Sequence, residues 1–269
     1  VYFCLYIPLL PLPLAMPPVK DGVCAFVEST GIGALPLYSK WSCDSVHLPS
    51  TSPCDNEWPG IVCFKFKIIA ISLPNLALQG SIPYQFLSLT AMTRLDLSRN
   101  NFTGTIPNEL ESVSLLEYLD LSGNKYLQGS IPDGIGELTK LKYVFLARTQ
   151  ISGELPSSLG KLNKLEYLSI WKTFINGSLP SELGSLTSLK QLELSKNKLD
   201  GSIPTELSQL TNLVMLDISG NYLMGGIPIE ISRMKTMVFT KNARVPVVTN
   251  VNTTNIQNVT VNVNENDSF

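Results

Sequence analysis

The sequence predicts a solenoid, a fold in which one short unit repeats along an axis and packs only against its neighbours. The main observation is a tetrapeptide of glycine, any residue, an aliphatic residue and proline that occurs seven times. Successive glycines are 24 or 25 residues apart, and a fixed period of this length is typical of a solenoid. The seven glycines are Gly80, Gly104, Gly129, Gly153, Gly177, Gly201 and Gly225. One elongated domain therefore accounts for the 269 residues better than two globular domains.

A second pattern, ahead of the glycines, predicts short strands. In Leu95-Asp-Leu97-Ser-Arg-Asn100, aliphatic residues alternate with polar ones, and three later repeats carry similar segments. Alternate residues of a strand point to opposite sides, so the residues between the leucines should face solvent. The asparagine should turn the chain inward, because its amide can both donate to and accept from backbone groups of the coil.

A third pattern follows each proline. Leucines three residues apart, as at Leu183 and Leu186, suit a short helix or 3₁₀ turn. The expected fold class is thus an α/β repeat: a solenoid of seven coils with a parallel sheet on its concave side and short helical or 3₁₀ turns on its convex side.

The combined pattern, LxxLxLSxNxLxGxIPxxLGxLxx, resembles the plant-type leucine-rich repeat over residues 64–240. Repeats of this type occur in receptor-like kinases, receptor-like proteins and secreted polygalacturonase inhibitors. The resemblance implies an extra short strand around the Gly-x-Ile-Pro segment and a gently twisted superhelix.

Four segments are expected along the chain. Residues 1–19 are apolar and rich in proline, and we interpret them as the remnant of a secretory signal peptide; an artefact of a partial gene model is the alternative. Residues 20–66 form an amino-terminal cap, and residues 67–240 hold the repeats. Residues 241–269 are a tail rich in Asn, Val and Thr, which forms either a strand along the open end or a disordered stalk.

The cap resembles that of the same family, in which a tryptophan covers the first coil beside a disulfide. The resemblance implies a disulfide between Cys54 and Cys63, with Trp58 packed on the first coil near Ile69 and Ile71. The chain has five cysteines. Cys43 could pair with Cys24, which would leave Cys4 alone, and the pairing of these three stays open.

Five Asn-x-Ser/Thr sequons, together with the cysteines, predict a glycosylated protein in the secretory pathway, outside the cell or at its surface. The asparagines are Asn101, Asn176, Asn252, Asn258 and Asn266. For the last three, chance occurrence in a tail rich in Asn and Thr is the alternative.

Composition and motifs argue against nucleic-acid binding and catalysis. The formal net charge is −2, and the single histidine, His47, rules out a Ser-His-Asp set built in the repeats. Asp96 and Asp120 would lie about 5 Å apart on neighbouring strands, similar to a retaining glycosidase pair. Both, however, occupy the acidic position of the repeat, which we expect to be exposed on an open face. We therefore expect no enzyme activity, cofactor, metal site or nucleic-acid partner.

The residues that strand alternation exposes differ in the two central repeats, 144–149 and 168–173. These repeats lose the acid, the serine and the asparagine of the others and carry aromatic and cationic residues instead. Together with the preceding repeat they form a predicted ligand-binding surface on the concave face, because contiguous exposed aromatics mark interaction sites. Its members are Tyr118, Tyr143, Phe145, Arg148, Tyr167, Trp171 and Lys172. Simple divergence of the repeats is the alternative.

Acidic residues on either side of this surface should steer polar or cationic parts of a ligand. They are Asp96, Asp120, Glu193 and Asp217. The leading function is an extracellular recognition module, by resemblance the ligand-binding ectodomain of a receptor-like kinase or receptor-like protein. Expected partners are a protein, peptide or cell-wall carbohydrate on the concave face, and a co-receptor. A secreted inhibitor of cell-wall glycosidases is the alternative. A structural or ice-binding role would favour a regular ladder of Thr or Asn.

Overall fold

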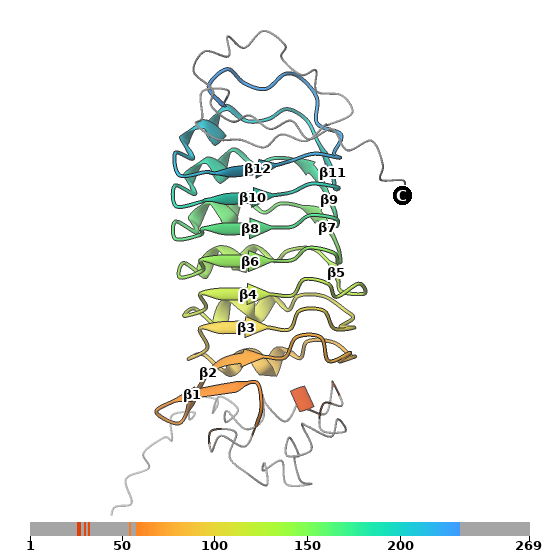
Figure 1. Cartoon of the computed structure of the whole chain (residues 1–269), viewed down its shortest axis with the longest axis vertical. Helices are drawn as coiled ribbons and strands as arrows, with labels where there is room; N and C mark the ends of the chain where they lie inside the picture. The colour runs from red at the N-terminus through yellow and green to blue at the C-terminus, as the bar shows by residue number, and fades with distance from the viewer. Residues whose placement is uncertain (1–25, 28–29, 31, 33–53, 55–57, 232–269) are drawn as a thin grey trace, which may run out of the picture.

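The computed structural model describes residues 26, 27, 30, 32, 54 and 58–231, which stack as successive coils along one axis (Figure 1). An eight-stranded sheet runs the length of the stack in the order β1-β2-β3-β4-β6-β8-β10-β12. Its strands are β1 (Ile61–Phe64), β2 (Lys67–Ser72), β3 (Arg94–Asp96), β4 (Tyr118–Asp120), β6 (Tyr143–Phe145), β8 (Tyr167–Ser169), β10 (Gln191–Glu193) and β12 (Met215–Asp217).

From β2 onward the strands are parallel, and each residue pairs with its counterpart one repeat later. Leu95 pairs with Leu119, and Leu119 with Val144. The coils are therefore stacked in register, as the sequence predicted. The first pair differs, because β1 and β2 are antiparallel. Lys65 and Phe66 between them both have positive φ angles, of 49° and 62°, and this tight two-residue turn reverses the chain.

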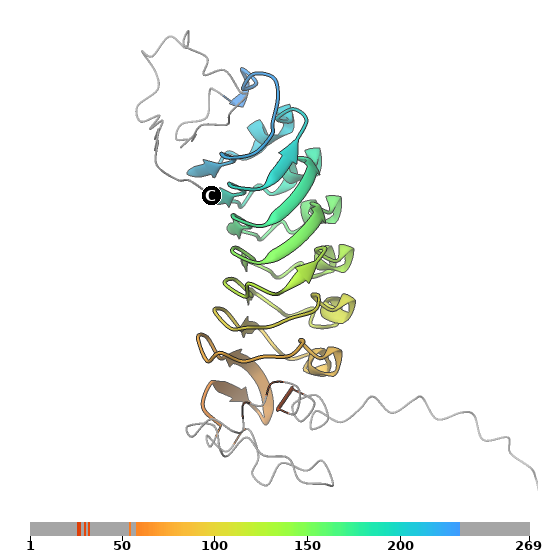
Figure 2. The ribbon, with the colours of Figure 1, turned by 90° about the vertical axis from the view of Figure 1, so that its right-hand side faces the viewer.

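The opposite side of each coil is a 3₁₀ turn, and Figure 2 shows these turns on the right with the sheet on the left, on the concave side. The turns are η4 (Tyr84–Ser88), η5 (Asn108–Ser112), η6 (Asp133–Glu137), η7 (Ser157–Lys161), η8 (Ser181–Ser185) and η9 (Thr205–Gln209). The proline of the tetrapeptide lies just before η5 to η9, for example Pro132 at φ −67°. Its ring fixes φ near this value and so sets the entry to the turn.

A second, four-stranded parallel sheet lies along the right-hand side of the coils in Figure 1, in the order β11-β9-β7-β5. Its strands are β5 (Gln128–Gly129), β7 (Gln150–Glu154), β9 (Phe174–Ser178) and β11 (Lys198–Asp200). These strands lead into or include the repeat glycine, where the family resemblance implied an extra strand. We call this surface the lateral sheet.

The core is a continuous column of aliphatic side chains between the sheet and the 3₁₀ turns. Leu119, Val144 and Leu168 from successive strands are at most 1% exposed, and Leu138 and Leu162 beside the turns are fully buried. Each coil buries its leucines only against the coils on either side, as expected for a solenoid. The 25-residue repeat leaves this order intact, because Tyr118 still pairs with Tyr143 across β4 and β6.

The described part of the cap closes the first coil. Cys54 and Cys63 form a disulfide with a sulfur–sulfur distance of 2.04 Å, the pairing that the resemblance implied. Trp58 is 2% exposed and belongs to the same buried cluster as Ile71. The leader 1–19, the tail 241–269, Cys4, Cys24 and Cys43 lie outside the described residues. Within the described part of the chain, no helix has both the length and the apolar character needed to cross a bilayer.

Candidate functional site

The first outward-facing residue of each concave strand forms a column along the sheet. In register it contains Arg94, Tyr118, Tyr143, Tyr167, Gln191 and Met215. The ring centroids of Tyr118 and Tyr143 are 5.8 Å apart, and those of Tyr143 and Tyr167 are 5.2 Å apart in a stacked arrangement. Arg94 extends the column, because its guanidinium carbon lies 3.5 Å from the centre of the Tyr118 ring.

Phe145 widens this column into a surface. It is the second outward-facing residue of β6, and its ring centroid lies 5.7 Å from that of Tyr118 on the neighbouring strand. The four rings are all half-buried, so each packs against a neighbour and still presents part of its surface to solvent. We call Tyr118, Tyr143, Phe145 and Tyr167 the aromatic surface. Arg94 was not among the predicted site residues, although its place in the same column was a usable signal.

The remaining predicted site residues lie just beyond the ends of β6 and β8. The guanidinium carbon of Arg148 is 5.1 Å from the centre of the Trp171 ring, within the range of a cation–π contact. Trp171 is half-buried, and Arg148 and Lys172 are exposed. The structure thus places all seven predicted residues on, or just beyond, the concave strands of three adjacent coils.

Arg148 and Lys172 have left-handed backbone conformations, with φ of 58° and 54°. The same position in the coil of β4 is Gly123, at φ 74°. This conformation costs a residue other than glycine roughly 1–2 kcal/mol. The cations therefore occupy a turn position that glycine fills more easily. The sequence pattern predicted only that the side chains at this position are exposed. The presence of glycine here in some repeats and of Arg or Lys in others was the available sign of a turn.

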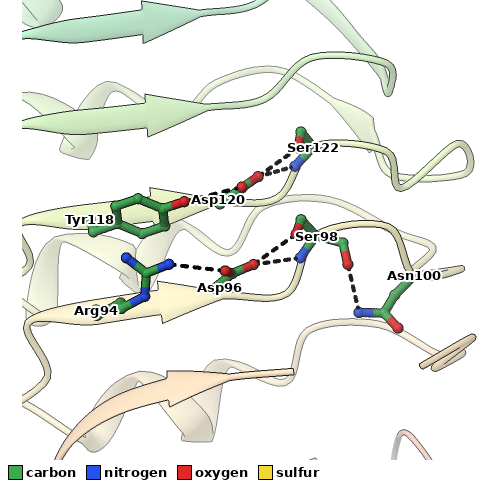
Figure 3. Close-up of polar contacts among 7 residues, drawn as sticks. All are labelled: Arg94, Asp96, Ser98, Asn100, Tyr118, Asp120 and Ser122. Atoms are coloured by element: carbon green, nitrogen blue, oxygen red, sulfur yellow. Dashed lines mark hydrogen bonds and ion pairs between the residues drawn. The ribbon is translucent and has the colours of Figure 1, made fainter. Parts of the chain in front are cut away.

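The acidic residues of the concave strands were expected to be exposed, and for Asp96 this expectation is wrong. Asp96 is 7% exposed rather than open to solvent. One of its carboxylate oxygens accepts from the backbone N–H of Ser98 at 3.2 Å and from its hydroxyl at 2.8 Å, and the other accepts from Arg94 at 3.1 Å (Figure 3). The carboxylate thus folds back over the end of its own strand, so it is not free to steer a ligand. Ser98 itself is also buried.

Asp120 repeats this arrangement one coil further along. Its carboxylate accepts from the backbone N–H of Ser122 at 2.9 Å and from its hydroxyl at 2.6 Å, and Tyr118 donates to it at 3.4 Å (Figure 3). Burial raises the pKa of Asp120, and the Ser122 hydrogen bonds oppose that rise. Burial also raises the pKa of Tyr118, with the Asp120 charge acting in the same direction. The two acids therefore build turns in their coils.

The coils of β6 and β8 lack these acids. Phe145 pairs with Asp120, and Ser169 pairs with Phe145, so two consecutive strands carry no carboxylate at this position. The Ser169 hydroxyl donates to Glu193 on the next strand at 2.7 Å. Along this row of outward-facing positions, Asp120 of β4 and Glu193 of β10 therefore stand on either side of β6 and β8, which carry no carboxylate there.

Two ion pairs border the surface at the residues just before the strands. Lys142 lies 2.8 Å from Glu117, and Lys190 lies 2.6 Å from Glu166. A hydrogen bond from each lysine to its glutamate raises the pKa of both lysines. Each pair joins successive coils, so the four side chains form an alternating row beside the tyrosines. This edge carries no net charge.

The rest of the described surface offers little that would hold a metal or a small molecule. A hollow of about 440 Å³ lies on the convex side between η5 and η6. It is lined by Asn108, Glu109, Glu111, Ser112, Pro132, Asp133 and Gly134. Among the described residues, no group of three or more His, Cys, Asp or Glu side chains is arranged to hold a metal ion. The aromatic surface is therefore the strongest candidate site in this part of the chain.

Comparison with known proteins places the chain in a family. A sequence model of the leucine-rich repeat region matches residues 79–265. The chain belongs to the leucine-rich repeat family. The chain is 35% identical over 80 residues to a probable leucine-rich repeat receptor-like protein kinase of Arabidopsis thaliana. The matched stretch covers 29% of this chain and 8% of the relative.

Two solved structures show the same repeat architecture. One is the ectodomain of the Arabidopsis thaliana membrane receptor kinase GASSHO1/SCHENGEN3 in complex with CASPARIAN STRIP INTEGRITY FACTOR 2, with 31% identity, a TM-score of 0.70, and coverage of 82% of this chain and 26% of that chain. The other is the Arabidopsis receptor kinase HAESA in complex with the peptide hormone IDA and the co-receptor SERK1, with 28% identity, a TM-score of 0.64, and coverage of 82% and 42%. The leucine-rich repeat chain spans less than half the length of each of these proteins. These matches confirm the plant-type leucine-rich repeat ectodomain that the sequence predicted.

Two of the five predicted glycosylation sites fall on described residues. Asn176 is exposed on β9 in the lateral sheet, and Asn101 is half-buried in the turn that follows β3. Asn252, Asn258 and Asn266 lie outside the described residues. Glycosylation of the two described sites stays a prediction.

Proposed function

We propose that this leucine-rich repeat chain is the ligand-binding part of a plant receptor-like protein and that it binds a peptide across the concave strands β4, β6 and β8. The observation that carries the proposal is the aromatic surface, where four half-buried rings from three adjacent strands are in contact. Aromatic residues and arginine supply most of the binding energy at many protein interfaces. One structural neighbour, the receptor kinase HAESA at 28% identity, holds a peptide hormone in its structure.

In this proposal the side chains of the site contact different parts of the peptide. Tyr143 and Phe145 provide the apolar platform for an anchor residue of the peptide, because their rings are already held by neighbouring rings and lose little freedom on binding. Arg148 and Lys172 lie at the end of the same strands and would meet a carboxylate or a hydroxyl-rich group. Within this division Arg94 keeps Tyr118 in place, since its guanidinium covers one face of the ring.

The proposal assigns binding and not catalysis to this chain. On the concave face, Asp96 and Asp120 are held by hydrogen bonds to the end of their own strands. The proposal also assigns the chain to the outside of the cell or the cell surface, which the Cys54–Cys63 disulfide favours. A co-receptor is the expected second partner, because SERK1 has this role in the HAESA complex.

Selection from a displayed library tests the proposal and does not require the natural ligand. Random twelve-residue peptides displayed on phage are selected on the purified, folded chain, and the peptides obtained are titrated against variants. We expect Tyr143→Ala to weaken their binding at least about thirtyfold, since truncating an interface hot spot costs about 2 kcal/mol or more. The matched control is Tyr126→Ala, which removes an exposed tyrosine away from the concave strands. Equal binding to the wild type and to Tyr143→Ala would overturn the proposal.

A further inference from the structure

Strand β9 of the lateral sheet brings an aromatic side chain next to a sequon asparagine. Along β9, Ile175 is buried, whereas Phe174 and Asn176 on either side of it are exposed. Residues two apart in a strand share a face and lie about 7 Å apart. Phe174 keeps 45% of its surface exposed. An exposed phenyl ring is therefore adjacent to the side-chain amide of Asn176.

The neighbouring strands complete a small cradle around this amide. Asn176 pairs with Glu154 of β7 on one side and with Lys198 of β11 on the other. The Lys198 ammonium nitrogen lies 5.0 Å from the centre of the Phe174 ring. The Glu154 side chain lies directly beside Gly177. A Cβ atom added at Gly177 would be only 2.8 Å from the Glu154 Cγ. Asn176 thus shares its strand face with an aromatic residue and pairs with a glutamate and a lysine on the neighbouring strands.

We propose that Asn176 carries an N-linked glycan and that the first sugar of this glycan packs on the ring of Phe174. Asn176, Gly177 and Ser178 form the required Asn-x-Ser sequence. In the transfer step, the amide nitrogen of Asn176 bonds to C1 of a sugar carried on a lipid pyrophosphate. The C1–O bond to the phosphate breaks, and the amide proton leaves with the lipid pyrophosphate. The inference rests on the proposed extracellular location.

The packing follows from the chemistry of the two groups. The C–H bonds on one face of N-acetylglucosamine carry partial positive charge, and the face of a phenyl ring carries partial negative charge, so the two attract weakly in addition to burying apolar area. Glu154 and Lys198 supply an acceptor and a donor for the sugar hydroxyls. Phe174 is exposed in the protein alone, and the sugar would cover it.

The sequon at Asn101, the second one on described residues, has no exposed aromatic ring beside it and so serves as a comparison for Asn176. Two residues before Asn101 stands Arg99, which lies in a left-handed turn rather than on the same strand face. The aromatic residue of this sequon, Phe102, is fully buried in the core and presents no ring to a sugar. The Thr103 hydroxyl donates to the carbonyl of Gly80 in the preceding coil. A glycan on Asn101 would therefore extend into solvent without an aromatic platform.

The test compares the two sites in the full chain, secreted from cultured mammalian cells behind an added signal peptide. A mannosidase inhibitor and endoglycosidase H leave one N-acetylglucosamine at each occupied site, and peptide mass spectrometry measures occupancy. We expect Asn176 to be occupied and Asn176→Gln to lower Tm by roughly 2 °C, a shift that a contact of this kind gives in a domain of this length. Asn101→Gln should leave Tm unchanged.

Two further sets of variants separate stacking from other effects. In a Phe174→Ala background, Asn176→Gln should no longer change Tm, whereas in a Phe174→Tyr background the loss of roughly 2 °C should return. Ser178→Ala should reproduce the effect of Asn176→Gln, since it removes the glycan and keeps the asparagine. The proposal fails if Asn176 is unoccupied in the secreted chain, or if the loss of Tm is the same with and without Phe174. Peptide binding is not measured here, so this failure would leave the proposed ligand-binding function untouched.

Discussion

The coils of β6 and β8 share one core with the coils on either side of them but differ from them on the concave face. Leu119 and Leu192 in the flanking coils and Val144 and Leu168 in the central coils are equally buried. On the concave face, however, the flanking coils carry an acid at the second outward-facing position, and the central coils carry Phe145 or Ser169 there. The buried positions decide the fold, and the outward positions are free to build a surface.

The difference has a structural cost inside the coil as well. In the flanking coil of β10, the Asn197 side-chain amide donates to the carbonyls of Ile170 in the preceding coil and of Leu194 in its own coil. In the central coil of β6, Thr149 stands at this position and donates only to Leu146 of its own coil. Threonine has one donor where asparagine has two. At this position the coil of β6 is therefore tied less firmly to the preceding coil than the coil of β10 is.

The largest effect that this comparison predicts is on stability. Asn197→Ala removes two donated bonds, to the carbonyls of Ile170 and Leu194, and leaves the backbone N–H of Ile175 without its side-chain acceptor in a buried site. We expect the free energy of unfolding to fall by about 3 kcal/mol. Thr149→Ala removes one bond within its own coil and should cost about 1 kcal/mol. Urea unfolding of the two variants measures both values, and equal losses would mean that the coil of β6 is tied at this position as firmly as the coil of β10.

The next effect is on binding. Trp171→Ala should weaken binding of a library-selected peptide by at least about 2 kcal/mol if Trp171 is a hot spot. Its side chain is half-buried on the concave side and touches Arg148, so the fold should persist with little change in Tm. Isothermal titration measures the affinity. The exposed Phe64 in the cap hairpin gives a control, because Phe64→Ala removes an aromatic ring far from the central coils.

The smallest effect concerns pH and the acid of a flanking coil. Burial raises the pKa of Asp120 above its ordinary value of 3.8, so the folded chain binds this proton more tightly than the unfolded chain. The stabilising contribution is present below the unfolded pKa and is lost as pH rises through the folded value. Relative to Asp120→Asn, the wild type should lose stability as pH is raised from acid to neutral. Paired thermal melts across this range measure the difference, and a difference that grows in the opposite sense would contradict the burial argument.

Much of the fold could be predicted because each coil repeats the same physical requirements. The period, the buried leucines and the asparagine turn recur in register, and any one repeat supports the interpretation of the others. The antiparallel β1 could not be predicted in the same way, since its hairpin turn at Lys65 and Phe66 occurs once and uses residues that are not typical of such turns.

Which outward-facing side chains lie together could be predicted from the sequence better than the geometry of the candidate site. Strand alternation correctly placed the aromatic residues on one face, because alternation depends only on the backbone. It was wrong for Asp96, because alternation does not show that a carboxylate folds back onto Ser98 at the end of its own strand. The left-handed conformation of Arg148 was missed for a related reason, since strand alternation says nothing of the turn that follows the strand; the glycines at this position in other repeats were the available signal.

The central claim is that the concave face of the central coils binds the ligand, and converting a central coil to the flanking pattern tests it most directly. In one variant, Phe145→Asp, Arg148→Gly and Thr149→Asn give the coil of β6 the acid, the glycine and the asparagine found in the coil of β4. A library-selected peptide is then titrated into the wild type and this variant. The account predicts that binding falls by more than about 100-fold, or roughly 3 kcal/mol, while Tm stays the same or rises. Unchanged affinity in a folded variant would contradict it and would place the binding site elsewhere in the chain.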